Sequence, residues 1–243
     1  MSRFLVLFAR EPAAQAREKG LASPGAAVLF RDFARGWIEA AREAGAKTIV
    51  AAPAQDLPVW RRALPGGLDI LWNPQIGNSL GERLEGSMLR AAALGGHAVV
   101  VGGDVPPCRS ALRNAYESLE GGVEAALSPA HDGGVSLLAL SPQDLGLLRS
   151  IRPRRRTVLR DLLRALRARG RSVRVLDPAP DLDGPRSVRA LLRRLPSGDC
   201  LRRLLRSLLA GVRPDEKLRP ASVPRRLFGS PCGLRAPPLA LPS

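Results

Sequence analysis

The sequence predicts an α/β protein with three layers, in which helices cover both faces of a mostly parallel but mixed central sheet. Seven short runs rich in apolar and β-branched residues alternate with stretches of helical spacing. Most of these runs are apolar throughout rather than alternating, as expected for strands that are buried on both faces. The chain of 243 residues is long enough for one such domain with a C-terminal extension.

The apolar runs place the predicted strands at residues 4–9, 48–53, 69–72, 98–103, 124–129, 135–140 and 173–177. Helical spacing predicts helices at about 24–44, 79–94, 110–119 and 156–169. Five residues join the fifth and sixth strands, which is too few for a parallel crossover of about a dozen residues. We therefore expect either a hairpin or a sixth strand that turns out of the main sheet, and one antiparallel element in both cases.

The positive charge is concentrated in the C-terminal part of the chain. The formal net charge is +16, yet residues 1–150 contain 15 basic and 15 acidic residues, whereas residues 151–243 contain 23 and 7. Such asymmetry can indicate an anionic partner, but arginine supplies nearly all of it, which is also typical of a compositional bias. Residues 201–212 have one leucine-rich helical face, and residues 213–243 contain seven prolines. We therefore expect a domain at 1–198, followed at 199–243 by a basic helix and a Pro-rich, flexible C-terminal tail.

Several classes of protein are disfavoured by the sequence. No apolar run is long enough to span a bilayer, and the N-terminus lacks the pattern of a signal peptide, so a cytoplasmic enzyme is expected. The three cysteines are widely spaced and predict neither a disulfide framework nor a zinc site. The phosphate loop of NTPases, the glycine motif of dinucleotide-binding proteins and the nucleophile elbow of hydrolases do not occur.

Acidic residues follow several of the predicted strands. Asp104 comes directly after 98-AVVVGG-103, Asp132 follows the fifth strand, and Asp181 and Asp183 follow the seventh. One aspartate at a strand end is an ordinary turn residue. Together, however, these carboxylates would converge above one sheet edge and repel one another unless a cation is bound there. Mg²⁺ or Mn²⁺ holding a nucleotide diphosphate is the simplest interpretation.

Five motifs in a fixed order resemble a known family. They are 8-FAREPAAQAREKGL-21, 75-QIGNSLGERL-84, 102-GGDVP-106, 128-SPAHDGGVSLLAL-140, and the pair 157-TVLRDLL-163 with 181-DLDGP-185. They resemble a bacterial family of GT-A-type glycosyltransferase-like proteins associated with arsenosugar biosynthesis, within the nucleotide-diphospho-sugar transferase superfamily. The resemblance covers roughly residues 3–195. It implies a three-layer, Rossmann-like GT-A fold that binds a nucleotide after the first strand and a divalent metal at the aspartate in mid-chain.

The resemblance also implies roles for individual residues. Asp104 corresponds to the metal-binding aspartate, with Asp183 as a second metal ligand, and Asp104 and Asp132 are the candidate catalytic residues. The nucleotide side is expected to include Arg10, Arg17, Lys19, Glu82 and Arg83, and the acceptor side His131, Gly133 and Gly134. Where the family reads K-T-R in its first loop, this chain has Glu18, Lys19 and Gly20.

Three functions are compatible with these motifs. The first is a metal-dependent glycosyltransferase that uses a nucleotide-sugar donor and a small-molecule acceptor, either active with altered substrates or degenerate. The second is nucleotidyl transfer from an NTP to a phosphorylated small molecule, as in guanylyltransferases. The third is a non-catalytic protein that binds an anionic partner through its basic C-terminal region; the arginine bias does not favour nucleic acid as that partner.

Overall fold

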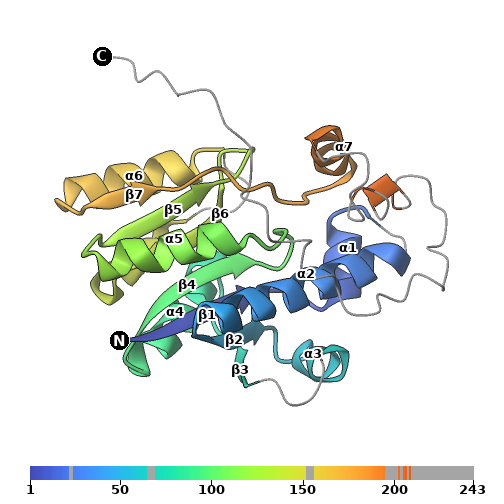
Figure 1. Cartoon of the computed structure of the whole chain (residues 1–243), viewed down its shortest axis with the longest axis horizontal. Helices are drawn as coiled ribbons and strands as arrows, with labels where there is room; N and C mark the ends of the chain where they lie inside the picture. Colours follow the sequence, from blue (N-terminus) through green and yellow to red (C-terminus); the bar gives the residue numbers. More distant parts are fainter. Residues whose placement is uncertain are drawn as a thin grey trace.

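The computed structural model describes residues 1–21, 24–64, 69–151 and 156–194, together with 202, 205, 206 and 208. A seven-stranded sheet forms the middle layer, and helices pack on both of its faces (Figure 1). The predicted three-layer α/β class is therefore confirmed. No helix within these described ranges is long and apolar enough to cross a membrane.

The strand order is β3-β2-β1-β4-β6-β5-β7, and within the described sheet β6 alone runs against its neighbours. β5 and β6 form a hairpin through residues 130–134, which confirms the expected antiparallel element. The strands are β1 Ser2–Phe8, β2 Ala46–Ala52, β3 Ile70–Pro74, β4 Gly96–Gly102, β5 Ala125–Pro129, β6 Val135–Leu140 and β7 Val173–Val175. All seven predicted strands are present.

The helices include the four that the sequence predicts. They are α1 Pro12–Glu18, α2 Pro24–Glu43, α3 Leu57–Ala63, α4 Leu80–Ala93, α5 Arg109–Glu120, the 3₁₀ helix η1 Pro142–Ser150, α6 Val158–Ala168 and α7 Pro185–Arg194. α1, α3, η1 and α7 were not predicted. α1 forms where an irregular phosphate loop was expected, because Glu11 caps its first turn, Pro12 fits the first helical position, and alanines favour the helix.

Strands β1 to β6 each contribute to two apolar cores because successive side chains point to opposite faces. On one face, Leu5 and Leu7 of β1 pack in a cluster with residues of α2, α3 and α5, including the fully buried Trp37. On the other face, Phe4 and Val6 pack in a cluster with residues of α4, η1 and α6. The rigid sheet between these layers fixes the positions of the loops at its ends.

A third apolar cluster joins the two ends of the described chain. It contains Ala16 of α1, several residues of α2, and Leu182, Val188 and Leu191 around α7. Leu205, on the leucine-rich face predicted for residues 201–212, is also buried in this cluster. The proposed boundary near residue 198 and the Pro-rich segment 213–243 lie outside the described residues.

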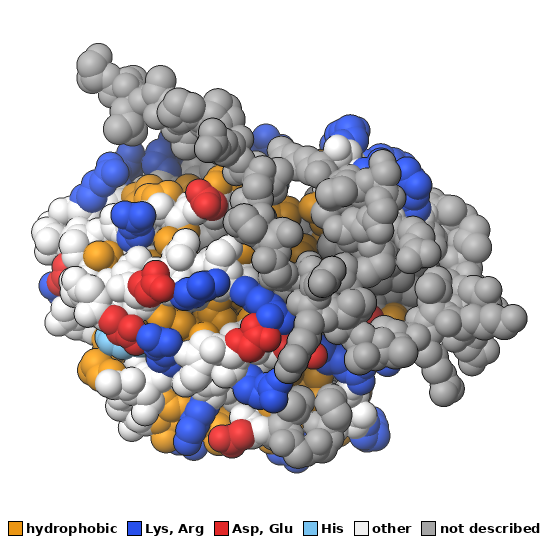
Figure 2. Space-filling view, in the orientation of Figure 1, with side chains coloured by type: hydrophobic (Ala, Val, Ile, Leu, Met, Phe, Trp, Pro, Cys, Tyr) orange, Lys and Arg blue, Asp and Glu red, His pale blue; other side chains and the backbone are white. Residues whose placement is uncertain are grey.

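Two helices near the C-terminal end of the described part carry several basic side chains each. α6 carries Arg160, Arg164 and Arg167, and α7 carries Arg186, Arg189 and Arg193. Basic side chains lie along the edge of the molecule where these two helices are drawn, whereas acidic and basic groups are interspersed over the rest of the visible face (Figure 2). Part of the basic excess of the C-terminal region therefore lies on α6 and α7.

Trp37 ties α2 to the loop that carries Asp104, because its indole Nε1 donates to the carbonyl oxygen of Val105 at 2.8 Å. We expect Trp37→Phe to keep most of the packing but to leave this buried carbonyl unpaired, at a cost of about 1–3 kcal/mol in the free energy of unfolding. Urea denaturation measures the difference. Trp72→Phe, at a part-exposed tryptophan of β3, is the matched control. A loss no larger than that of the control would contradict the role given to this hydrogen bond.

Candidate functional site

The candidate site lies at the carboxyl edge of the sheet, where the ends of β1, β4 and β5 meet the segment before α7 (Figure 1). β1 leads into Ala9 and Arg10, β4 leads into Asp104, and β5 leads into the turn with Asp132. The C-terminal segment reaches the same place because the amide of Leu182 donates to the carbonyl oxygen of Asp104 at 3.0 Å. The structure thus brings together all four aspartates that the sequence singled out.

The Lys19 ammonium lies between two of these aspartates. Its Nζ is 2.5 Å from Asp104 Oδ2, and it also contacts Asp183 Oδ1. Burial lowers the Lys19 pKa, but the two carboxylates outweigh that effect and hold the pKa above its ordinary value. Lys19 is therefore a fixed positive charge at the site across the physiological pH range.

Three aspartates form a tighter acidic cluster. Oxygens of Asp132, Asp181 and Asp183 all lie within 4.8 Å of one another. Asp181 and Asp183 flank the fully buried Leu182, which anchors both of them. Asp132 is held in its turn by the amide of Gly134, which donates to Oδ1 at 2.8 Å. Carboxylate oxygens from two separate segments at this spacing are the donor set of a divalent cation such as Mg²⁺ or Mn²⁺.

The electrostatics of this cluster are unbalanced. Burial and the neighbouring carboxylates, Asp183 first, raise the pKa of Asp181 to about 7. Burial also acts to raise the pKa of Asp183, but the hydrogen bond from Lys19 outweighs it and the pKa is lowered. Among the described residues, the ammonium of Lys19 pairs with two of the four carboxyl groups that gather here once Asp104 is included. The residues present therefore fit a bound divalent cation, which would offset the remaining negative charge.

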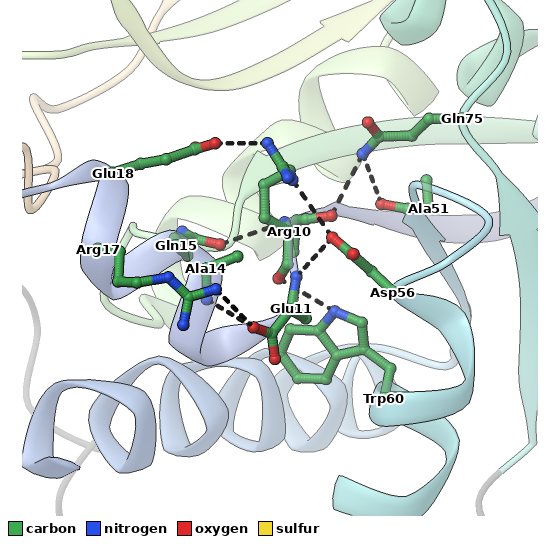
Figure 3. Close-up of polar contacts among 11 residues, drawn as sticks. Arg10, Glu11, Ala14, Gln15, Arg17, Glu18, Ala51, Asp56, Trp60 and Gln75 are labelled. Carbon is green, nitrogen blue, oxygen red and sulfur yellow. Dashed lines mark hydrogen bonds and ion pairs between the residues drawn. The ribbon is translucent and has the colours of Figure 1, made fainter.

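The loop after β1 forms a network around Arg10 (Figure 3). The Arg10 guanidinium donates to the buried Asp56 through Nε at 3.2 Å and contacts Glu18 through Nη1. Asp56 also accepts from the amide of Glu11 at 2.9 Å. Above the loop, the amide of Gln75 donates to the carbonyl oxygens of Ala9 and Ala51. This network fixes the first loop against the ends of β1 and β2.

The other residues predicted on the nucleotide side have local partners in the structure. Arg17 is exposed and pairs with Glu11 at 3.5 Å. Glu82 completes the capping box of α4 with Ser79, and backbone amides of Asn78 and Ser79 lower its pKa. The Arg83 Nε donates to the Ser79 carbonyl oxygen at 3.3 Å. The contacts of Glu82 and Arg83 with Ser79 stabilise the start of α4, which accounts for these residues in the 75–84 motif. Contact between a nucleotide and Arg17, Glu82 or Arg83 stays a prediction.

The acceptor-side turn is positioned by close backbone packing. Gly133 has a φ of +89°, and a Cβ at that position would lie 2.1 Å from the carbonyl oxygen of Arg156. Its own carbonyl accepts from the amide of Leu159 at 3.1 Å. A glycine is therefore required here for the turn to pack against the start of α6. His131 and Asp132 lie exposed at this turn, where an acceptor could reach them.

Two functional features were missing from the sequence interpretation. The sequence pattern places Asp181 at the strand ends, but the resemblance assigns it no metal-binding role, although it belongs to the acidic cluster. Neither the pattern nor the resemblance points to Asp56, which anchors Arg10. The signal for Asp56 is local, because an aspartate before Leu57-Pro58 is typical of a helix start, and Asp56 is the N-cap residue of α3.

One known family model matches the middle of the chain. Residues 38–153 match a family model described as "Uncharacterized protein conserved in bacteria (DUF2064)", which spans slightly less than half of the chain. No curated protein matches the sequence. None of these findings bears on arsenosugar biosynthesis, so that association stays a prediction.

Solved structures confirm the fold. A "putative nucleotide-diphospho-sugar transferase" from Desulfovibrio desulfuricans G20 aligns with a TM-score of 0.73 and 24% identity, over 87% of this chain and 97% of that one. Rv0371c from Mycobacterium tuberculosis H37Rv aligns with a TM-score of 0.53 and 19% identity, over 80% of this chain and 100% of that one. The inositol-1-phosphate CTP transferase of T. maritima aligns with a TM-score of 0.52 and 12% identity, over 88% of this chain and 98% of that one. The chain therefore has the fold of the nucleotide-diphospho-sugar transferases.

The raised pKa of Asp181 predicts how stability changes with pH when no metal is present. An aspartate whose folded pKa of about 7 exceeds its unfolded value near 3.9 stabilises the fold fully below the unfolded pKa and loses this contribution as the pH rises to the folded pKa. In EDTA, we expect the Tm of the wild type to fall relative to that of Asp181→Asn between about pH 4.5 and 7.5 and to change little above that range. Each 1 kcal/mol corresponds to about 2–4 °C in a chain of this size.

Differential scanning calorimetry at low salt measures this difference. Asp69→Asn, at an exposed aspartate before β3, corrects for the general effect of removing a carboxylate. A Tm difference between wild type and Asp181→Asn that stays constant with pH would contradict the assignment.

Proposed function

We propose that this protein is a metal-dependent glycosyltransferase that uses a nucleotide-sugar donor and a small-molecule acceptor. The observation that carries the proposal is the convergence of Asp104, Asp132, Asp181 and Asp183 beside the basic residues of the first loop. In α/β sheets of this kind, ligands bind at the carboxyl ends of the strands, where these residues lie. The shared fold of the nucleotide-diphospho-sugar transferases supports the same interpretation.

Each part of the site has a task in such a transfer. Asp132, Asp181 and Asp183 would hold Mg²⁺ or Mn²⁺, which when bound supplies charge neutralisation for the leaving nucleoside diphosphate. Arg10 and Lys19 would face the anionic donor from the first loop. Asp104, which the resemblance implied as a metal ligand and catalytic residue, pairs with Lys19 and would hold it in position beside the metal. Asp132, at the exposed turn, would bind or deprotonate the acceptor hydroxyl.

The reaction that follows from these roles is a substitution at the sugar. The acceptor oxygen forms a bond to the anomeric carbon, while the bond from that carbon to the diphosphate oxygen breaks and the nucleoside diphosphate leaves. The hydroxyl proton passes to a carboxylate, for which Asp132 is the candidate. Nucleotidyl transfer from an NTP, the other reaction that the sequence left open, would instead release pyrophosphate. Identification of the released product therefore separates the two reactions.

Binding of a nucleotide sugar should depend on both the metal and the acidic cluster. We expect the Tm of the wild type to rise with at least one of the UDP-, GDP- or dTDP-sugars or free NTPs when Mn²⁺ is present, because a ligand of the native state stabilises it by mass action. At a hundredfold excess over the Kd the gain is about 2.7 kcal/mol. Asp183→Asn should abolish the metal-dependent part of this shift.

The matched control for that panel is Asp69→Asn, which removes a carboxylate far along the chain from the acidic cluster. It should behave as the wild type does. If no nucleotide gives a metal-dependent shift in any of the three proteins, the chain is not a transferase of this kind.

Glu18 is expected to weaken nucleotide binding, because its carboxylate pairs with the Arg10 guanidinium and places a negative charge on the phosphate side of the loop. Glu18→Gln should tighten the binding of a nucleoside diphosphate by up to about fivefold, the range of an exposed ion pair. The gain should shrink as salt is added. Isothermal titration calorimetry measures it, with Glu117→Gln on α5 as the control. Unchanged or weaker binding by Glu18→Gln would contradict the placement of Arg10 beside the phosphates.

A further inference from the structure

Lys19 has an arrangement that differs from an ordinary surface ion pair. Its side chain is 22% exposed, and it contacts the carboxylate of Asp104, 18% exposed, and that of Asp183, 42% exposed. One ammonium thus joins two carboxylates that come from distant parts of the chain. Exposed pairs contribute little because solvent screens them, but a part-buried cation with two partners is screened less.

The backbone on both sides holds this contact in place. Lys19 is the C-cap residue of α1, and the next residue, Gly20, has a φ of +64° that ends the helix. On the opposite side, a Cβ at Gly184 would lie only 3.2 Å from the Lys19 carbonyl oxygen, so the two segments pack closely. The hydrogen bond from Leu182 to Asp104 joins the segment before α7 to the loop after β4, which carries the other carboxylate that Lys19 contacts. The ammonium is therefore built into the junction between the first loop and the segment before α7.

Asp183 belongs to two groups at once. It is a partner of Lys19, and it is also one of the three carboxylates whose oxygens lie within 4.8 Å of one another. A divalent cation bound by Asp132, Asp181 and Asp183 would draw on the same Asp183 carboxylate as the lysine. Two cations cannot share that group without repulsion, so binding of one weakens the hold of the other.

We propose that Lys19 is an internal cation that competes with the divalent metal for Asp183 and that neutralises Asp104 and Asp183 when the metal is absent. This inference rests on the proposed function, since it requires a divalent cation at the acidic cluster. Metal binding then leaves the ammonium with fewer carboxylate partners and makes its charge available to an anionic substrate. Lys19 acts here as a positioning residue that links the metal site to the first loop.

The affinity for Mn²⁺ tests this competition directly. We expect Lys19→Met to bind Mn²⁺ at least tenfold more tightly than the wild type, which corresponds to about 1.4 kcal/mol. Lys19→Gln should show the same change, and it provides a second variant with a polar side chain. Lys19→Arg keeps the positive charge and should stay within about threefold of the wild type. Isothermal titration calorimetry on the full chain gives all four dissociation constants.

Thermal unfolding of the same proteins tests whether a change in Mn²⁺ affinity comes from a general loss of structure. In EDTA, Lys19→Met should have a lower Tm than the wild type, because Asp104 and Asp183 lose their cation. In Mn²⁺, its Tm should rise by more than that of the wild type. Lys47→Met, at an exposed lysine of β2, removes a positive charge at the opposite edge of the sheet and should change neither quantity.

The outcomes separate the inference from the proposed function. If the wild type binds Mn²⁺ and the uncharged Lys19 variants bind it with equal or lower affinity, the competition is disproved while the metal-dependent function stands. If neither the wild type nor any variant binds Mn²⁺, the metal dependence of the proposed function fails, and the inference fails with it.

Discussion

Repulsion among carboxylates at one edge of the sheet is the constraint on which the site depends. Asp104, Asp132, Asp181 and Asp183 gather there because parallel strands end on the same side and because Leu182 bonds to the β4 loop. Nothing in the fold requires the acidic groups themselves, and their proximity is unfavourable without a cation. Within the described residues, Lys19 supplies a positive charge that pairs with two of these carboxylates, and the pKa of Asp181 is raised to about 7. The remaining negative charge is the physical argument for the proposed metal site.

The fold was predictable because its signals are local and repeated. Apolar runs identify all seven strands, and the short 130–134 link identifies β6 as the antiparallel strand. The helix α1 was less predictable, because a resemblance in which this region binds phosphate suggested an irregular loop. There, the cap formed by Glu11 and the helix-favouring alanines determine the conformation instead.

The site was only partly predictable for a different reason. The strand pattern predicts which aspartates share an edge, and the structure places all four together. It does not predict which carboxylates come nearest to one another, since that depends on how Leu182 is buried between α1, α2 and α7. The contact between Lys19 and Asp183 is likewise invisible in the sequence, because no periodicity relates residues so far apart.

The distance along the chain between these two residues affects how the protein folds. Lys19 and Asp183 are separated by 164 residues, so their contact closes a loop that contains almost the entire sheet. Contacts of such high sequence separation form late, because the chain must first lose the entropy of closing the loop. During synthesis, β1 to β6 can assemble while the segment before α7 is still being made. We therefore expect the acidic cluster, which needs this contact, to form only after most of the sheet is in place.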